Sequence, residues 1–133
     1  MALVFDESLK TGITDIDIQH NFLFEAINSL ENISLLESND DMWLTLCKIE
    51  QFTQNHFKTE ENYMLKYKYP DTQEHITQHN SFLDKYTLLK KDFEEEGLSE
   101  NYLINLRMFL SGWIIDHYTN TDVKMAEFLR SFL

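Results

Sequence analysis

The chain has 133 residues, a length typical of one compact domain, and its 43% hydrophobic content is enough to build a core. Its net charge of −12 argues against nucleic acid and against anionic membrane surfaces, because both attract clustered Lys and Arg. With only 3 Gly and 1 Pro, the chain has too few turn-forming residues for an all-β fold, and the composition favours long helices.

The first dozen residues are expected to form an extended arm that ends at Gly12. Asp15 or Asp17 is then expected to cap a first helix, because the apolar residues that follow recur at the three- and four-residue spacing of a helix. These residues are Ile16, Leu23, Ile27 and Leu30. The polar run 37–40 interrupts the pattern and predicts the end of this helix.

A second helix is expected to end near Tyr69-Pro70-Asp71, since proline disfavours helix in the residue before it. Its apolar residues are Leu44, Ile49, Phe52, Phe57 and Met64. A third helix is expected from about Pro70 to Phe93, because proline suits a first helical turn. Its apolar residues are Ile76, Phe82, Leu83, Tyr86 and Leu89.

The acidic residues 94–96 are expected to form a linker, with Gly97 as a C-cap. Ser99 or Asn101 can then open a fourth helix, and the apolar tail from Val123 to Leu133 is expected to pack back on the others. The apolar residues of the fourth helix are Leu103, Leu106, Leu110, Trp113 and Ile114. Four long helices with short connections predict an all-α, antiparallel up-and-down four-helix bundle, one domain over residues 1–133.

Each of the four predicted helices carries histidine in register with its apolar residues. The five histidines are His20, His56, His75, His79 and His117. His75 and His79 lie four residues apart, so both rings point to one side of their helix, and His56 and Glu60 repeat this spacing. Burying five imidazoles without partners is costly, whereas a metal site satisfies them together.

Asp122 is the second candidate carboxylate ligand, and its spacing from His117 is unusual. Five residues place it about 140° round an ideal α-helix from His117. To reach the same site, the helix has to loosen between the two residues or carry a π-bulge, a feature that favours functional sites.

The number and kind of ligands predict the metal. Five histidines, two bridging carboxylates and one bridging oxygen fill about eleven of the roughly twelve positions of two octahedral ions, so one position stays open. Zinc prefers fewer ligands, and calcium or magnesium prefers oxygen alone. Mixed ligation of this kind suits iron, with manganese second. No Glu-x-x-His pair of the ferritin-like di-iron enzymes occurs, and neutral histidines support high-valent iron poorly, which favours a carrier over an oxygenase.

The stretch from His56 to His79 has the pattern His-Phe-x-x-Glu-Glu-x-x-Met…Tyr-Pro-x-x-x-x-His-x-x-x-His. Ile16-Asp17-x-Gln19-His20 precedes it, and His117-x-x-x-x-Asp122 follows it. In this order the motifs resemble the bacterial haemerythrins over nearly the whole chain. The resemblance implies that His75, His79 and His117 bind one iron. His20 and His56 would bind the other iron, which keeps the open position, and Glu60 and Asp122 would bridge the two.

The resemblance also implies an oxygen pocket next to the open position. Leu23, Phe57, Trp113 and Ile114 match the apolar pocket of the family, although each of them also fits an ordinary core position. Tyr118 departs from the family, which usually has an aliphatic residue directly after the last histidine. Its hydroxyl can hydrogen-bond the bound oxygen species, narrow the pocket or point outward, and a donor there can speed autoxidation.

The resemblance predicts reversible binding of dioxygen for storage, delivery or buffering, by a protein that is not an enzyme. The alternatives are a di-iron peroxidase or nitric-oxide-handling enzyme, and an oxygen sensor that acts through a separate partner. Cys47 is the only cysteine, so no intrachain disulfide is expected, and the sequence shows neither a secretory signal nor an apolar run of about 20 residues. We therefore expect a cytoplasmic monomer without membrane insertion, whose protein recipient the sequence does not indicate.

Overall fold

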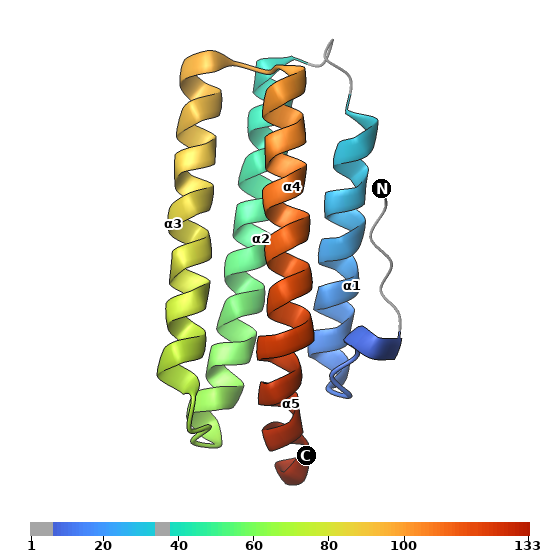
Figure 1. Ribbon diagram of the computed structural model, residues 1–133, viewed down its shortest axis with the longest axis vertical. Coiled ribbons are helices and arrows are strands. Elements are labelled where there is room, and N and C mark those ends of the chain that lie inside the picture. Colours follow the sequence, from blue (N-terminus) through green and yellow to red (C-terminus); the bar gives the residue numbers. More distant parts are fainter. Residues whose placement is uncertain (1–6, 34–37) are drawn as a thin grey trace.

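The computed structural model describes residues 7–33 and 38–133, and its four long helices run alternately up and down, side by side (Figure 1). They are α1 (Thr14–Ser29), α2 (Asn39–Lys66), α3 (Thr72–Glu96) and α4 (Glu100–Asp116). The chain continues from α4 through η3 (His117–Asp122), which is π-helical, into α5 (Val123–Leu129). No strand occurs among the described residues, so the predicted all-α bundle is confirmed.

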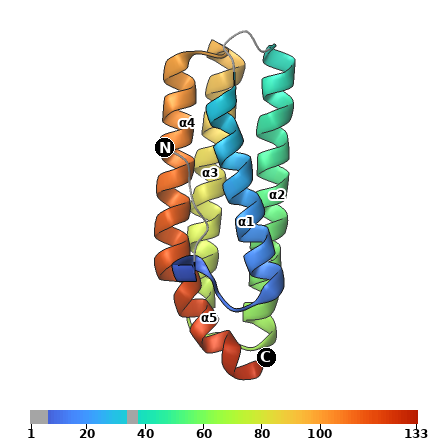
Figure 2. The same cartoon turned by 90° about the vertical axis from the view of Figure 1, so that its right-hand side faces the viewer.

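Three short 3-10 turns complete the described elements: η1 (Glu7–Leu9), η2 (Leu30–Asn32) and η4 (Arg130–Phe132). The arm is therefore not extended throughout as expected, since Glu7–Leu9 forms a turn, and the remainder of the predicted arm, residues 1–6, lies outside the described residues. After this turn the chain runs across the side of the bundle, from beside α4 to the start of α1 (Figure 2). No described helix combines the length and apolarity needed to cross a bilayer.

The N-terminal cap of α1 differs from the prediction. The cap residue is Ile13, which makes no side-chain capping bond, and Asp15 and Asp17 lie inside the first turn. The Asp17 carboxylate instead accepts hydrogen bonds from Thr11 N and Oγ1, at 2.7 and 2.8 Å, and from Gly12 N at 3.2 Å. Asp17 thus holds the turn in front of the helix, a task that spacing alone does not distinguish from capping.

The ends of α3 also differ from the prediction. The helix begins at Thr72, two residues after Pro70, and it continues through residues 94–96, which we expected to form a linker. Glutamate is a good helix former, so nothing in the acidic run stops the helix before Gly97. Gly97 adopts a φ of 77°, which glycine tolerates without strain, and the predicted C-cap is confirmed. Ser99 caps α4, as predicted, by accepting a hydrogen bond from Tyr102 N.

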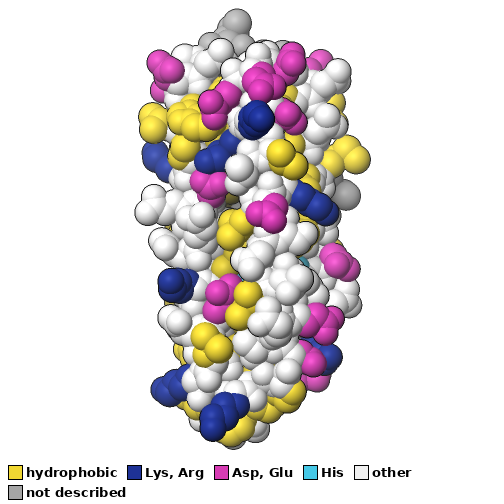
Figure 3. All heavy atoms as spheres, turned by 90° about the vertical axis from the view of Figure 1, so that its left-hand side faces the viewer, with side chains coloured by type: hydrophobic (Ala, Val, Ile, Leu, Met, Phe, Trp, Pro, Cys, Tyr) yellow, Lys and Arg dark blue, Asp and Glu magenta, His cyan; other side chains and the backbone are white. Residues whose placement is uncertain are grey.

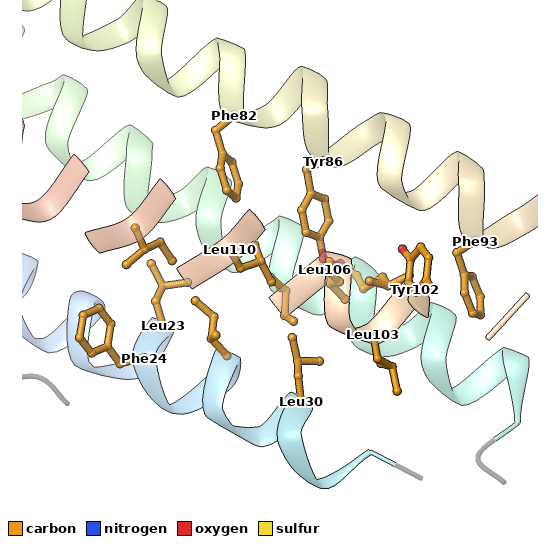
Figure 4. Packing of buried hydrophobic residues seen from close by; sticks show 14 of the residues in the cluster. Leu23, Phe24, Leu30, Phe82, Tyr86, Phe93, Tyr102, Leu103, Leu106 and Leu110 are labelled. Atoms are coloured by element: carbon orange, nitrogen blue, oxygen red, sulfur yellow. Dashed lines mark hydrogen bonds between the residues drawn. The ribbon is translucent and has the colours of Figure 1, made fainter. Parts of the chain in front are cut away.

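The hydrophobic core divides into two clusters. The larger one fills the interior between the four helices, where residues such as Leu23, Phe82 and Leu110 point toward one another (Figure 4). The smaller one joins the start of α1 and the end of α2 to α5, and so confirms that the tail packs back on the bundle. Its buried members are Ile13, Ile16, Met64, Tyr69, Met125, Ala126 and Leu129. Leu44 does not join the core as expected: it is 55% exposed, whereas Met42 and Leu46 are fully buried.

The two clusters are separated by a layer of buried polar side chains. On α1, His20 lies between Ile16 of the smaller cluster and Leu23 of the larger one. On α2, Glu60 lies in the same way between Phe57 and Met64. Apolar side chains therefore cover this layer along the bundle axis in both directions, which keeps water from reaching it along that axis.

Candidate metal centre

The structure brings the seven side chains that the sequence singled out into this one layer. Each of them is at most 1% exposed. Figure 3 shows almost no histidine on the face of the molecule that it displays. The seven form two sets in which the potential ligand atoms lie within 4.8 Å of one another: Glu60, His75, His79, His117 and Asp122 form one, and His20, His56, Glu60 and Asp122 the other. Glu60 and Asp122 belong to both sets.

The oxygens of Glu60 divide between the two groups of histidines. Oε1 lies 3.2 Å from Nε2 of His75 and 3.1 Å from Nε2 of His79. Oε2 lies 3.2 Å from Nε2 of His20 and 3.1 Å from Nε2 of His56. One carboxylate therefore faces a different group of imidazoles with each of its oxygens, which is the arrangement that a bridging ligand requires.

The two oxygens of Asp122, near the C-terminus, are divided between the two groups of histidines in the same way. Its Oδ1 lies 3.1 Å from Nε2 of both His75 and His117, and its Oδ2 lies 3.0 Å from Nε2 of His20. Asp122 reaches this position because residues 117–122 form a π-helical segment, which widens the helix between His117 and Asp122. The local loosening predicted from the five-residue spacing is confirmed.

Side chains around the layer hold the outer nitrogens of three histidines. Nδ1 of His56 lies 2.7 Å from Oε1 of Gln19, and Nδ1 of His79 lies 2.8 Å from Oε2 of Glu61. Nδ1 of His117 lies 2.9 Å from Oε1 of Gln78. An oxygen acceptor at Nδ1 places the proton there, so the lone pair of Nε2 points into the layer.

Gln19, Glu61 and Gln78 were not assigned a role from the sequence. Gln19 and Gln78 each directly precede a histidine, and Glu61 directly follows Glu60, so adjacency to the motif was the only available signal. Gln19 and Glu61 even stand within the motifs quoted above. Their role becomes visible only in the hydrogen bonds, because glutamine and glutamate are common on any exposed helix face.

The inward-facing atoms fit bound cations. Nε2 of His56, Nε2 of His117 and both carboxylate oxygens of Asp122 are buried without a hydrogen-bond partner among the described residues. Several of these atoms nevertheless lie about 3 Å apart, as His117 Nε2 and Asp122 Oδ1 do at 3.1 Å. Lone pairs that face one another in a dry interior are unfavourable unless a positive charge, either a proton or a metal ion, lies between them. Imidazole and carboxylate donors together suit iron.

The charges of the layer depend on one another. Burial lowers the pKa of His20 and His117, but the carboxylates of Asp122 and Glu60 outweigh burial and raise both to about 9. For His56, burial outweighs the carboxylates, and its pKa is lowered. Burial raises the pKa of Glu60 and Asp122, yet the surrounding imidazoles hold both below their usual range. The carboxylates are therefore ionised, and any metal that binds has to displace protons from His20 and His117.

Aromatic rings lie flat on three of the imidazoles, those of His20, His79 and His117. The ring centroids are 3.8 Å apart for Phe57 and His79, and 4.3 Å apart for Trp113 and His117. Leu23 and Ile114 are buried in the larger cluster, while Trp113 is half-buried at its edge. All four predicted pocket residues thus lie in or against the apolar cluster, and their role in binding oxygen remains a prediction.

Tyr118 lies against the layer. Its ring stacks on His20, and the whole residue is only 1% exposed, so the alternative that it points outward is wrong. Its hydroxyl is buried and finds no hydrogen-bond partner among the described residues. Burial raises the pKa of this phenol well above its usual value, and the nearby carboxylates add to the effect, so the hydroxyl keeps its proton.

The chain resembles known proteins over most of its length, although no family model matches it. It is 25% identical over 126 residues to a bacteriohemerythrin of Clostridium acetobutylicum, covering 90% of this chain and 95% of the relative. It is 27% identical over 128 residues to one from Pseudomonas aeruginosa, covering 96% and 82% respectively. A "hemerythrin-like protein" of Naegleria gruberi is 26% identical over 120 residues, covering 90% of this chain and 87% of the relative.

Solved structures share the fold. Crystal structures of a leucine-to-tyrosine and a leucine-to-alanine mutant of hemerythrin superpose with a TM-score of 0.83 at 24% identity, covering 97% of this chain and 98% of theirs. The buried histidine and carboxylate cluster fits a di-iron centre. Together these findings show that the chain resembles the bacteriohemerythrins in sequence over most of its length and hemerythrin in fold.

Proposed function

We propose that this protein is a single haemerythrin-like domain that binds dioxygen reversibly at a non-haem di-iron centre. In this proposal His75, His79 and His117 hold one iron. His20 and His56 hold the other, and Glu60 and Asp122 bridge the two. The observation that carries the proposal is the division of each carboxylate, whose two oxygens face different groups of imidazoles at 3.0–3.2 Å.

The unequal number of histidines on the two sides supports a single open position. Three imidazoles belong to one of the two ligand sets, and two belong to the other. When bound, a di-iron pair supplies two electrons and one free coordination place for dioxygen. His20 and His56 border that place in this assignment, and Tyr118 lies on His20, 3.6 Å between ring centroids.

The surroundings of the layer support binding without turnover. Leu23, Phe57 and Ile114 are buried hydrocarbon side chains that donate no proton. A dry pocket slows the entry of protons and so slows the irreversible loss of electrons from the centre. These apolar side chains beside the layer thus favour release of dioxygen over its reduction.

A second candidate function rests on Tyr118. Its buried hydroxyl has no partner among the described residues, and it keeps its proton. A proton donor beside the open position favours consumption of peroxide or nitric oxide, so a di-iron peroxidase or nitric-oxide-handling enzyme is the alternative. A further alternative is an oxygen sensor, in which the same oxygen binding is detected by a separate partner protein.

Repeated oxygenation tests the proposal. The protein is reconstituted anaerobically with two ferrous ions per chain, exposed to oxygen and then deoxygenated, while its visible absorption is followed. We expect a charge-transfer band that appears and disappears over several cycles. Irreversible oxidation in the first cycle would contradict the proposal, and rapid catalytic consumption of peroxide or nitric oxide would favour the enzyme.

We also propose that the protein acts as a monomer in the cytoplasm, for oxygen storage, delivery or buffering. The free thiol of Cys47, which is half-buried, is compatible with a reducing compartment. Analytical ultracentrifugation of the iron-loaded protein tests the monomer, and a dimer at micromolar concentration would overturn it.

A further inference from the structure

The histidines of the centre are not held equally from outside. Outer side chains fix Nδ1 of His56, His79 and His117 at 2.7, 2.8 and 2.9 Å. Nδ1 of His75 is buried and has no hydrogen-bond partner among the described residues. The residue is 1% exposed and is the fourth residue of α3, near the end of that helix. Its ring can therefore turn about its side-chain bonds without breaking an outer hydrogen bond.

A polar cavity lies next to the unanchored nitrogen. It has a volume of about 170 Å³, and His75 forms part of its wall. Oxygen-bearing side chains line it from the start of α3 and from η3, among them Glu74, Gln78, Asn120 and Thr121. Glu74 and Asn120 are exposed, whereas His75 is buried, so the cavity leads from the surface to the layer of ligands.

We propose that His75 is the gate of the metal centre and that this cavity is the vestibule through which metal ions enter and leave. The inference rests on the proposed function in one respect, namely that the seven buried residues hold metal. The vestibule is several times larger than the roughly 30 Å³ that one water occupies, so it has room for a displaced imidazole. When the His75 ring turns into it, the oxygens of Glu60 and Asp122 become accessible from the vestibule.

The lining of the vestibule suits a hydrated divalent cation. Hard cations prefer oxygen ligands, so carbonyl, hydroxyl and carboxylate oxygens can bind a hydrated cation as it moves through the vestibule. Asp71 is paired with Lys124 at 2.6 Å, so Glu74 supplies the uncompensated negative charge. Along the bundle axis, by contrast, the two hydrophobic clusters close the layer and offer a cation no polar path.

A second polar cavity provides a matched control. It has a volume of about 260 Å³, and Asp15, Thr59, Asn62, Tyr63 and Lys66 line it. None of the seven ligand residues does so. Asn62 is exposed and stands two residues after Glu60, as Asn120 is exposed and stands two residues before Asp122. A bulky side chain at either position narrows one cavity at the same sequence separation from a predicted ligand.

The rate of metal uptake tests the gate. Metal-free wild-type protein, Asn120→Trp and Asn62→Trp are mixed with cobalt(II), and the visible bands of the bound ion give the rate and the final amount. We expect two ions per chain in all three proteins, and a rate roughly tenfold lower in Asn120→Trp alone, since narrowing the path raises the barrier. Release of the bound cobalt to a chelator should also be slower in Asn120→Trp than in the other two proteins.

A charge variant provides a second comparison. Glu74→Gln should slow metal uptake at low ionic strength, and this effect should disappear in high salt. Glu95→Gln changes the net charge equally near the far end of α3 and should leave the uptake rate unchanged. Equal uptake rates in Asn120→Trp and Asn62→Trp at full occupancy would overturn the gate and leave the proposed centre intact. Failure of the wild-type protein to bind two ions would overturn the centre and the gate together.

Discussion

The phenol ring of Tyr118 lies flat on the imidazole of His20, with 3.6 Å between ring centroids and 16° between ring planes. The same tyrosine is also stacked on Phe24, at 5.7 Å between centroids. The two contacts fix the ring in the interior and leave its hydroxyl buried without a partner among the described residues. This hydroxyl is thus a free proton donor beside the proposed open position.

Removing this hydroxyl should prolong the oxygenated state. Tyr118→Phe keeps the stacked ring but removes the donor, so we expect autoxidation to slow roughly tenfold, the effect of one hydrogen bond of about 1.4 kcal/mol. The measurement is the decay of the visible band of the oxygenated protein. The metal-free variant should be as stable as the wild type or more so, because a buried hydroxyl without a partner is unfavourable. Equal decay rates would show that the hydroxyl takes no part.

Removing an outer anchor should weaken metal binding. Oε1 of Gln78 accepts hydrogen bonds from His117 Nδ1 at 2.9 Å and from Thr121 Oγ1 at 2.8 Å. In Gln78→Ala the imidazole loses its fixed orientation, so we expect metal affinity to fall by roughly 10- to 100-fold in a chelator competition assay. Gln73→Ala, at an exposed position of the same helix, is the control and should bind like the wild type. An unchanged affinity in Gln78→Ala would mean that the backbone alone orients His117.

Neutralising a bridging carboxylate should disrupt the pair of ions. In Asp122→Asn the side chain keeps its size but loses the charge that faces His20, His75 and His117. We expect fewer than two irons per chain by elemental analysis after desalting, because the remaining carboxylate neutralises less of the added charge. Asp116→Asn, an exposed carboxylate on α4, changes net charge equally and should retain two irons. Full occupancy of Asp122→Asn would contradict a bridging role.

The turn before α1 should contribute measurably to stability. Asp17 accepts three hydrogen bonds from Thr11 and Gly12, and the carbonyl oxygen of Thr11 in turn accepts one from Arg130 Nη1 at 2.6 Å. Asp17→Ala should lower the free energy of unfolding by roughly 1–3 kcal/mol in urea denaturation, since it leaves these donors unpaired. Glu25→Ala, at an exposed position of α1, should change it by less than about 0.5 kcal/mol. A similar loss of unfolding free energy in both variants would mean that removing a negative charge from α1 causes the effect, and not the loss of these hydrogen bonds.

The layer of seven residues was predictable because histidines and carboxylates followed the helical period of the apolar positions. His20 shares a face with Ile16, Leu23 and Ile27, and all four are buried. The π-helical segment was predictable for a similar reason, since Asp122 cannot join His117 on a regular α-helix. In both cases the spacing of the residues along the chain, together with their burial, allowed few arrangements of the side chains.

The outer anchors and the helix ends were not predictable from spacing. Gln19 and Gln78 are half-buried glutamines, and only the direction of their side chains distinguishes them from solvated ones. Asp17 stands where a helix cap is plausible, but its carboxylate binds the preceding turn instead. Residues 94–96 resemble a solvated linker by charge, although their helix propensity decides their conformation.

Resonance Raman spectroscopy of the oxygenated, iron-loaded protein tests reversible oxygen binding most directly. The spectrum is recorded with ordinary oxygen, with the heavy oxygen isotope and again after deoxygenation. An intact dioxygen unit at the centre predicts an O–O stretching band that shifts to lower frequency with the heavy isotope and vanishes when oxygen is removed. The absence of any isotope-sensitive O–O band in a protein that holds two irons would contradict the proposed function.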